Sequence, residues 1–147
     1  MKVHIVYTII LCLMLGACHS TKSIAGKKSF YDFDESNKLS FVMDRAVSYD
    51  KLIFVDFHAS WCLPCKIMDE QIDQDPMLKR ALKENYITYK VNGEKGFGRD
   101  LMVIFDIKAF PTFLFLDQQG KELARQEGTA SNQELYELSQ ASIRLTE

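Results

Sequence analysis

The stretch Trp61-Cys62-Leu63-Pro64-Cys65-Lys66, preceded by the apolar run Ile53-Phe54-Val55-Asp56-Phe57, decides the fold class. The run predicts a buried strand, and the residues from the first cysteine onward predict a helix. Cys62 then lies at a helix N-terminus, where free backbone N–H groups and the helix dipole favour an anionic sulfur. Because thiolate is the reactive form of cysteine and Cys65 follows one helical turn later, the pair indicates a redox centre that can close as a disulfide.

Residues 1–17 have the pattern of an export signal rather than of a folded segment. Lys2 gives a short positive start, and Ile5 to Leu15 form an apolar region that is too short to span a bilayer comfortably. The segment ends in Leu15-Gly16-Ala17-Cys18, which resembles the lipobox of bacterial lipoproteins, in which the cysteine is acylated and becomes the new N-terminus. The alternative is an ordinary secretory signal that is cleaved nearby, with Cys18 incidental.

These features predict a lipoprotein signal peptide at 1–17, a lipidated cysteine and flexible tether at 18–28, and one domain at 29–147. Several acyl chains would hold the protein at a membrane surface. The expected location is therefore the cell envelope, with the domain facing the periplasm. His19, rather than an aspartate, follows the lipid cysteine, and this resembles an outer-membrane address, so the outer membrane is favoured over the inner.

The composition limits the classes of function. The formal net charge is −2, and no second apolar segment is long enough to span a membrane, so the sequence indicates no nucleic-acid partner and no further membrane span. Of the four cysteines, Cys12 would leave with the signal and Cys18 would carry lipid. A bridge between the remaining two closes a loop too small to stabilise the fold much, so a redox couple is favoured over a structural bridge.

Hydrophobic periodicity and turn residues predict the other elements. The order is strand, helix, strand, helix, then a hairpin and a last helix, which predicts an α/β fold with a central mixed β-sheet flanked by helices on both faces. The predicted strands are Phe30 to Phe33, Leu52 to His58, Tyr86 to Val91, Thr112 to Leu116 and Lys121 to Gln126. The predicted helices are 37–49, one that starts at Cys62 or Leu63, a segment from Pro76 with Met77, Leu78, Ala81 and Leu82 inward, Arg99 to Phe105, and one opened by a Ser131–Glu134 capping box and ending near Arg144.

Two motifs resemble a known family. The stretch from Val55 to Cys62 is similar to the strand that leads into the active site of the thioredoxin family, and Phe110-Pro111-Thr112 is similar to its cis-proline loop. The segment from Cys65 to Glu70, with Asp75-Pro76-Met77-Leu78 after it, is closer to the C-terminal thioredoxin-like domains of periplasmic disulfide interchange proteins. The resemblance covers nearly all of the predicted domain and implies the thioredoxin fold.

The resemblance also implies roles for single residues. Asp56 would be a buried acid that moves a proton to or from Cys65; the alternative is a carboxylate at the end of a strand that faces water. Lys90 aligns with a lysine that lies near this acid, or is a solvated strand lysine. A cis bond between Phe110 and Pro111 would leave the Phe110 backbone free to pair with an extended substrate. The predicted substrate-binding residues are Trp61, Leu63, Pro64, Phe110, Pro111 and Thr112.

Two neighbours of the motif have alternative interpretations. Trp61 would cover one side of the sulfurs, or it would pack in the core. His58 replaces a tryptophan common in the family, and packing is its expected role, although a histidine near the dithiol could add pH dependence.

The predicted reaction is thiol–disulfide exchange. The Cys62 thiolate attacks a disulfide in a partner protein, and Cys65, activated through Asp56, then attacks Cys62 and releases the reduced partner. Asp56 and Lys90 resemble residues of the reducing members of the family, so the resemblance implies a reductase. Its expected substrates are disulfides in exported proteins. No flavin, haem or nicotinamide motif is present, so no cofactor is expected. The electrons would come from an upstream dithiol protein, for example a membrane electron conductor.

Two other interpretations stay open at this point. A disulfide oxidase or isomerase would use the same residues with a less reducing couple. A lipid-anchored binding or holdase module would carry the two cysteines as a minor feature. Zinc is disfavoured, because a closed site needs four ligands and the chain beyond the lipid cysteine offers Cys62, Cys65, His58 and a histidine in the tether; no metal is expected.

Overall fold

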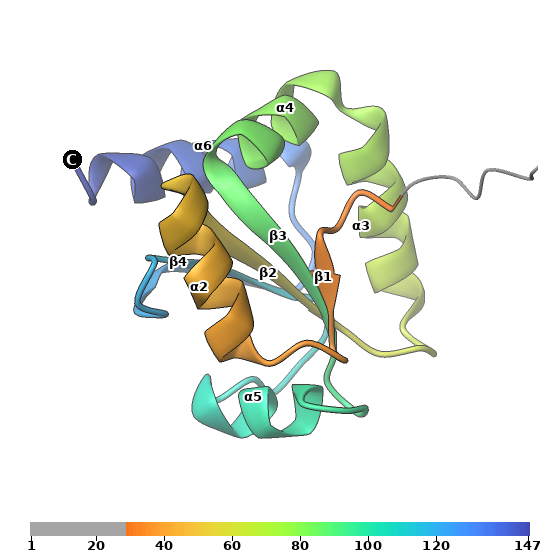
Figure 1. The fold of residues 1–147 in the computed structure, drawn as a ribbon. Coiled ribbons are helices and arrows are strands. Elements are labelled where there is room, and N and C mark those ends of the chain that lie inside the picture. Colours follow the sequence, from red (N-terminus) through yellow and green to blue (C-terminus); the bar gives the residue numbers. More distant parts are fainter. Residues whose placement is uncertain (1–28) are drawn as a thin grey trace, which may run out of the picture.

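The computed structural model describes residues 29–147, so the predicted signal peptide, the lipidated Cys18 and the tether lie outside the described residues. Five strands form one mixed sheet in the order β1-β3-β2-β4-β5 (Figure 1). The strands are β1 (Phe33–Asp34), β2 (Leu52–His58), β3 (Tyr86–Asn92), β4 (Thr112–Leu116) and β5 (Glu122–Glu127). The helices are α2 (Leu39–Tyr49), α3 (Leu63–Gln74), α4 (Pro76–Asn85), α5 (Gly98–Ile104) and α6 (Asn132–Arg144).

The sheet is parallel on one side of β2 and antiparallel on the other. β1 and β2 both run parallel to β3, whereas β4 runs antiparallel to β2 and to β5. Helical crossovers connect the parallel strands, and a tight turn that ends at Gly120, with φ +80°, connects β4 to β5. The predicted mixed sheet is confirmed.

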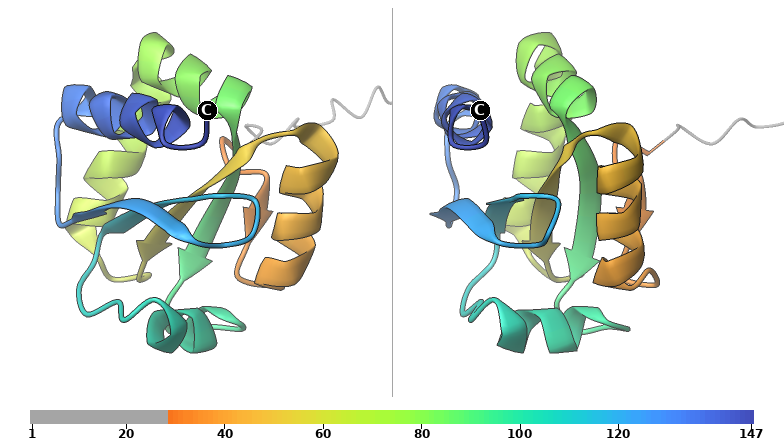
Figure 2. Two further views of the ribbon diagram at one scale, coloured as in Figure 1. Left: turned by 90° about the vertical axis from the view of Figure 1, so that its left-hand side faces the viewer. Right: turned by 60° about the vertical axis from the view of Figure 1, so that its left-hand side comes forward.

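Helices cover both faces of the sheet, as predicted. Figure 2 shows the sheet edge-on, between α2 on one side and α6 on the other. Strand residues alternate between two hydrophobic clusters. One cluster joins Ile53, Val55 and Phe57 to α2 and to Leu101 of α5. The other joins Phe54, Phe113 and Phe115 to residues of α3, α4 and α6. Asp56 has the parity of the second set, so its side chain belongs to the face that α3 covers.

Asp75 separates α3 from α4. It ends α3, and its Oδ1 accepts hydrogen bonds from Met77 N and Leu78 N, which caps the start of α4. The prediction that Met77 points inward is wrong, since Met77 is 52% exposed. The buried stripe of α4 runs through Leu78, Ala81 and Leu82. Met77 is one position before this stripe, which rotates it by about 100° around the helix and into solvent.

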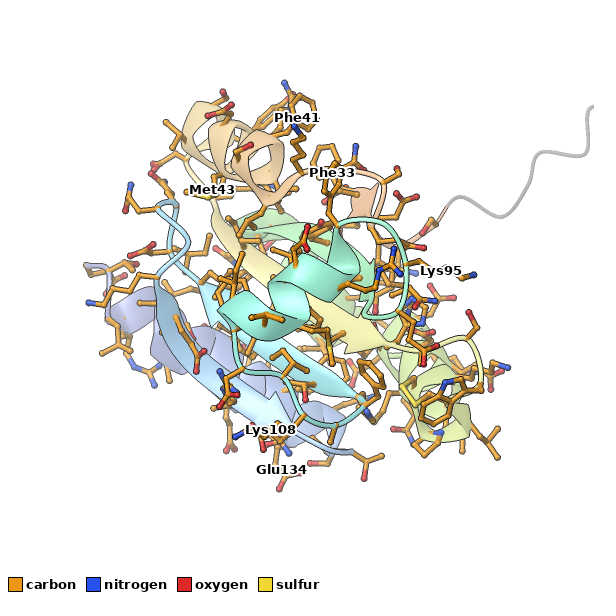
Figure 3. All side chains as sticks on the ribbon, turned by 90° about the horizontal axis from the view of Figure 1, so that it is seen from below. Phe33, Phe41, Met43, Lys95, Lys108 and Glu134 are labelled. Carbon is orange, nitrogen blue, oxygen red and sulfur yellow. A yellow bond between two sulfur atoms is a disulfide. The ribbon has the colours of Figure 1, made fainter. Side chains whose placement is uncertain are left out.

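The predicted N-terminal strand is shorter than expected and begins later. Only Phe33 and Asp34 pair with β3, opposite Tyr89 and Lys90. The residues before them are nevertheless attached to β3, because Asp32 N donates to Thr88 O at 2.8 Å. Figure 3, seen from the end where α5 lies, shows Phe33 beside Phe41 of α2, and the two rings meet edge to face at 5.5 Å.

The other predicted elements are present with boundaries shifted by one or two residues. α3 starts at Leu63 with Cys62 as its N-cap. The capping box of α6 is confirmed, with Ser131 Oγ accepting from Glu134 N. Within residues 29–147, none of the helices has the length and apolar character needed to cross a bilayer.

Candidate active site

A disulfide lies at the junction of β2 and α3. Cys62 and Cys65 are joined by an S–S bond of 2.03 Å. Sγ of Cys62 also accepts a hydrogen bond of 3.2 Å from Cys65 N, so the N-cap side chain of α3 is the sulfur itself. Pro64 occupies the first turn, where its missing N–H is not needed. The dipole of α3 therefore points its positive end at Cys62, as the sequence predicts.

Both cysteines are almost enclosed. Each residue is 2% exposed, and they pack with Ala59 and Phe110. Trp61 and Leu63 stand on either side of Cys62 in the sequence and are 68% and 64% exposed. The core-packing alternative for Trp61 is thus wrong. The nearly enclosed disulfide therefore lies next to two exposed apolar side chains, which belong to Trp61 and Leu63.

Trp61 is held from two sides. Its ring meets Phe110 edge to face, with the ring centres 6.2 Å apart, and its indole N–H donates to Glu94 Oε1. Glu94 lies in the loop between β3 and α5, next to Lys95, which Figure 3 labels. The neighbouring Gly93 is in close contact with this site, because a Cβ there would lie 2.7 Å from the tip of the Phe110 ring.

The bond between Phe110 and Pro111 is cis, as the resemblance implied. Pro111 O accepts from Gly128 N at 2.8 Å, and the buried Thr112 hydroxyl donates to Ala109 O at 2.9 Å. No described residue hydrogen-bonds to the backbone of Phe110. The loop thus leaves that peptide group free for an extended chain, while the Thr112 side chain supports the loop from inside.

A charged cluster lies on the face of the sheet that α3 covers. Asp56 of β2 is beside Lys90 of β3 in the strand register, and Lys90 Nζ donates to Asp56 Oδ2 at 3.0 Å. Lys90 Nζ also donates to Oδ1 of Asp69, one helical turn after Cys65 on α3. The hydroxyl of Tyr31 donates to Asp56 Oδ2 at 2.5 Å and lies 3.2 Å from Asp69 Oδ1. One lysine therefore bridges two carboxylates.

The environment of this cluster favours the neutral form of its buried acid. Burial raises the pKa of Asp56, and Lys90 offsets only part of that effect. Burial alone would lower the pKa of Lys90, but the two carboxylates outweigh it, so this pKa is raised. Burial and then the Lys90 charge lower the pKa of His58. Asp56 is thus buried rather than solvated, and Lys90 is paired with it rather than free in solvent.

Sequence reasoning missed three residues that complete this arrangement. Asp69 was within reach of prediction, because it follows Cys65 by four positions and such pairs share a helix face. Glu94 and Tyr31 carried no such signal, since their contacts with Trp61 and Asp56 span 33 and 25 residues. Within residues 29–147, no group of three or more potential ligand side chains is arranged to hold a metal ion.

The comparison with protein families agrees with this geometry. A model of the thioredoxin-like domain matches residues 41–142, which include the disulfide, the buried acid and the cis-proline. The chain belongs to the thioredoxin-like family. It is a thioredoxin-like thiol–disulfide oxidoreductase whose active-site disulfide joins Cys62 and Cys65.

The individual curated relatives are thioredoxins and thiol:disulfide interchange proteins. Thioredoxin from Mycoplasmoides gallisepticum is 31% identical over 99 residues, which are 65% of this chain and 89% of that protein. The thiol:disulfide interchange protein DsbD from Pseudomonas fluorescens is 25% identical over 101 residues, which are 68% of this chain and 17% of that protein. Two other curated relatives are likewise matched over less than half of their length.

Among solved structures, a candidate disulphide isomerase from Bacteroides thetaiotaomicron superposes with a TM-score of 0.67 and 26% identity. The match covers 77% of this chain and 91% of that one. The oxidised C-terminal domain of DsbD from Neisseria meningitidis has a TM-score of 0.60 at 19% identity over 71% of this chain and 92% of that one, which supports the thioredoxin fold alone.

Proposed function

We propose that this thioredoxin-like protein is a reductase for disulfides in exported proteins. The observation that carries the proposal is the pair of carboxylates, Asp56 and Asp69, that share one lysine, with Asp69 one helical turn after Cys65 on α3. With both carboxylates ionised the cluster is net negative and disfavours thiolate nearby; with one protonated it holds a proton for the dithiol. A disulfide couple becomes a strong oxidant when its reduced form is stabilised, and this cluster gives no such stabilisation to the thiolate.

The exchange reaction is divided between the two sulfurs. In the reduced protein the Cys62 thiolate at the start of α3 attacks a partner disulfide, and one partner sulfur leaves as thiolate. Cys65 then gives its proton to Asp56 and attacks Cys62 Sγ, which reforms the intramolecular disulfide and releases the second partner sulfur. Two electrons pass to the partner, whose sulfurs take up two protons from the solvent and the acid cluster.

The partner would bind at the exposed surface around Trp61 and Leu63. Its extended chain would pair with the unbonded backbone of Phe110 at the cis-proline. The upstream electron source would be another dithiol protein, such as a membrane electron conductor. DsbD, which is a distant relative, is described as a thiol:disulfide interchange protein.

The redox direction is tested by two measurements. The potential, followed by the fluorescence of the single tryptophan in glutathione or dithiothreitol buffers, should lie nearer to about −270 mV, as in thioredoxin, than to about −120 mV, as in DsbA. Cys65→Ser should trap partners as mixed disulfides on Cys62 in intact cells, and Cys62→Ser serves as the matched control. A potential near the oxidising value would overturn the reductase, and the absence of covalent partners would favour a binding module.

The location is proposed from the sequence alone. Cys18 would carry the lipid, and residues 19–28 would let the domain work at the periplasmic face of a membrane, with the outer membrane favoured. Metabolic labelling with a fatty-acid analogue should mark the wild type and leave Cys18→Ala unlabelled. Labelling of both proteins, or of neither, would contradict the anchor without affecting the exchange reaction.

A further inference from the structure

Tyr31 is the member of the acid cluster that comes from outside the core elements of the fold. It belongs to the N-terminal segment (residues 29–32), which runs beside α3 before it enters β1 (Figure 1). The hydroxyl of Tyr31 is 2.5 Å from Asp56 Oδ2, and Lys90 Nζ lies 4.6 Å from the centre of the tyrosine ring. One side chain therefore donates to the buried carboxylate and also covers the lysine that pairs with it.

The N-terminal segment is firmly fixed, so the position of Tyr31 is well defined. Phe30 packs into the hydrophobic cluster beneath α3 and meets the Tyr31 ring edge to face at 5.0 Å. On the other side, Asp32 accepts from Thr88 N at 2.9 Å and from Lys83 Nζ at 2.9 Å. A residue anchored on both sides can hold its hydroxyl in place while the disulfide opens and closes.

Exposure increases in steps from the buried acid toward solvent. The side chain of Asp56 is 3% exposed, that of Lys90 20%, and that of Asp69 33%. Beyond Asp69 there is a cavity of about 370 Å³ lined by residues of the N-terminal segment and α3, among them Tyr31, Asp69 and Glu70. The cavity lining includes neither cysteine nor the cis-proline. The cluster thus meets solvent on a flank of the domain that a partner at the disulfide need not cover.

One polar atom of the cluster has no hydrogen-bond partner. Asp56 Oδ1 is buried without a hydrogen-bond partner, whereas Oδ2 takes both Tyr31 and Lys90. In the oxidised state shown here, Cys65 carries no proton that could be donated. Once the disulfide is reduced, Cys65, which is a buried residue of α3, carries a thiol proton. Oδ1 is then the oxygen left free to receive that proton.

We propose that Tyr31 is a positioning residue of the exchange reaction. By occupying Oδ2, it keeps Oδ1 of Asp56 available for the proton of Cys65, which then passes by way of Asp69 to solvent at the flank cavity. This inference rests on the proposed role of Asp56 as proton acceptor. In the step, the Cys65 S–H bond breaks and an Asp56 O–H bond forms. The thiolate attacks Cys62 Sγ, the partner sulfur leaves with the electron pair, and Asp56 gives up its proton by way of Asp69 to water.

The charged and titratable groups around Asp56 come from each neighbouring element. They are Tyr31 from the N-terminal segment, Asp69 from α3, Lys90 from β3 and His58 from β2, while β4 places the apolar Phe113 opposite. Burial raises the pKa of Tyr31 well above its usual value, so its hydroxyl stays a donor throughout the working range. The Tyr31 hydrogen bond lowers the pKa of Asp56, and the Asp69 charge raises it.

Tyr31→Phe tests the proposal, because the ring contacts remain and only the hydroxyl is lost. The rate of single-turnover insulin reduction is measured as a function of pH. In Tyr31→Phe the rise of this rate on the acid side should move to higher pH, so that the rate in that region is about fivefold lower, while the plateau at high pH is unchanged. Asp69→Asn should move the same rise to lower pH. Tyr49→Phe, which alters an exposed hydroxyl bonded to Arg45 at 2.6 Å, is the control and should change neither.

A purely structural role for Tyr31 would lower the plateau and leave the midpoint in place, and that result would overturn the proposal. The ¹³C titration of the Asp56 carboxyl in the reduced protein gives a second readout that needs no substrate. Its midpoint should rise in Tyr31→Phe and fall in Asp69→Asn; no shift in either variant would refute the inference. If the wild type fails to reduce insulin, the proposed function fails, while the titration still decides the role of Tyr31.

Discussion

The indole N–H of Trp61 donates a hydrogen bond of 3.1 Å to Oε1 of Glu94, and this bond connects the rim of the active site to the loop after β3. Trp61 is otherwise largely exposed, with Phe110 as its aromatic neighbour. The carboxylate therefore fixes the orientation of a large side chain on the surface where a partner would bind. We expect such a contact to affect the reaction with protein substrates and not that with small reductants.

Glu94→Ala should lower kcat/KM for insulin about twofold to fivefold, because one solvent-exposed hydrogen bond contributes roughly 0.5–1 kcal/mol. Glu94→Gln keeps an acceptor oxygen and should retain the wild-type value. The rate of reduction by dithiothreitol should be the same in all three proteins. An equal loss with the small reductant would show that Glu94 acts on the disulfide and not on the rim.

Asp56→Asn should stabilise the oxidised protein at neutral and alkaline pH. Burial raises the pKa of Asp56 in the folded state, so the folded protein holds a proton that the unfolded chain releases. Stability of the wild type thus falls as pH rises from the ordinary aspartate value through the raised one, and then levels off. The variant should be more stable there, because its amide has no proton to lose and each unit of pKa shift corresponds to about 1.4 kcal/mol.

Urea unfolding at several pH values measures this effect. The difference between Asp56→Asn and wild type should shrink toward acid pH, where both side chains are neutral. Asp44→Asn, at an exposed position on α2, should show no comparable gain. A variant that is less stable than wild type at pH 8 would show that the Lys90 ion pair outweighs the burial of the carboxylate.

His58 should lower the stability of the wild type as the pH falls into the mildly acidic range, which is opposite to the effect of Asp56. Burial is the main reason that the pKa of His58 is lowered, so the unfolded chain binds a proton more readily than the folded protein does. The His58 contribution is thus lost as pH falls below about 6.5, the ordinary histidine value, toward the lowered one. His58→Gln should gain stability relative to wild type between pH 8 and pH 5 in urea unfolding. A constant difference over that range would rule out the effect.

Gly98→Ala should destabilise the fold and disturb the rim together. A Cβ at Gly98 would lie 2.0 Å from the carbonyl oxygen of Asn92, a backbone atom that cannot move aside cheaply. The Asn92 side chain in turn donates to Ser60 Oγ and accepts from Glu94 N. We expect a loss of about 2–3 kcal/mol, at the upper end for overpacked sites.

The comparison variant for Gly98 is Gly128→Ala. At Gly128 no atom lies within 4 Å of the new Cβ, so only the cost of φ +78° applies, about 1 kcal/mol. Thermal or urea unfolding of both variants gives the difference. A loss at Gly98 no greater than that at Gly128 would mean that the β3–α5 connection adjusts freely around Asn92.

The elements of this fold follow from local pattern to a large extent. β2 was recognisable because a continuous apolar run suits a strand buried on both faces, and α6 because Ser131 and Glu134 cap each other. Met77 was misplaced because it is apolar and adjacent to the buried Leu78, and composition alone does not fix the rotation of a short helix. The two-residue β1 was misplaced because edge pairing depends on β3 rather than on its own sequence.

The site residues that belong to short sequence motifs were predictable. Cys62, Cys65 and Pro111 have short motifs, and the buried polar Asp56 breaks an apolar run. Tyr31 and Glu94 act through contacts that exist only after distant segments have packed, and either side chain would be unremarkable on a surface. The contacts of Tyr31 and Glu94 thus depend on tertiary structure that no local pattern encodes.

Both lateral edges of the sheet are poorly suited to strand addition within the described residues. β1 offers only two residues, and the outer strand β5 carries Arg125, which binds Glu122, Glu127 and the Phe105 carbonyl. Charged and very short edges discourage the docking of foreign strands. An unfolded tail of a client would not readily pair with either edge strand. Its main chain would instead pair with the peptide group of Phe110, within reach of the sulfurs. The two sheet edges would thus contribute to the selection of clients, because they disfavour strand pairing away from the disulfide.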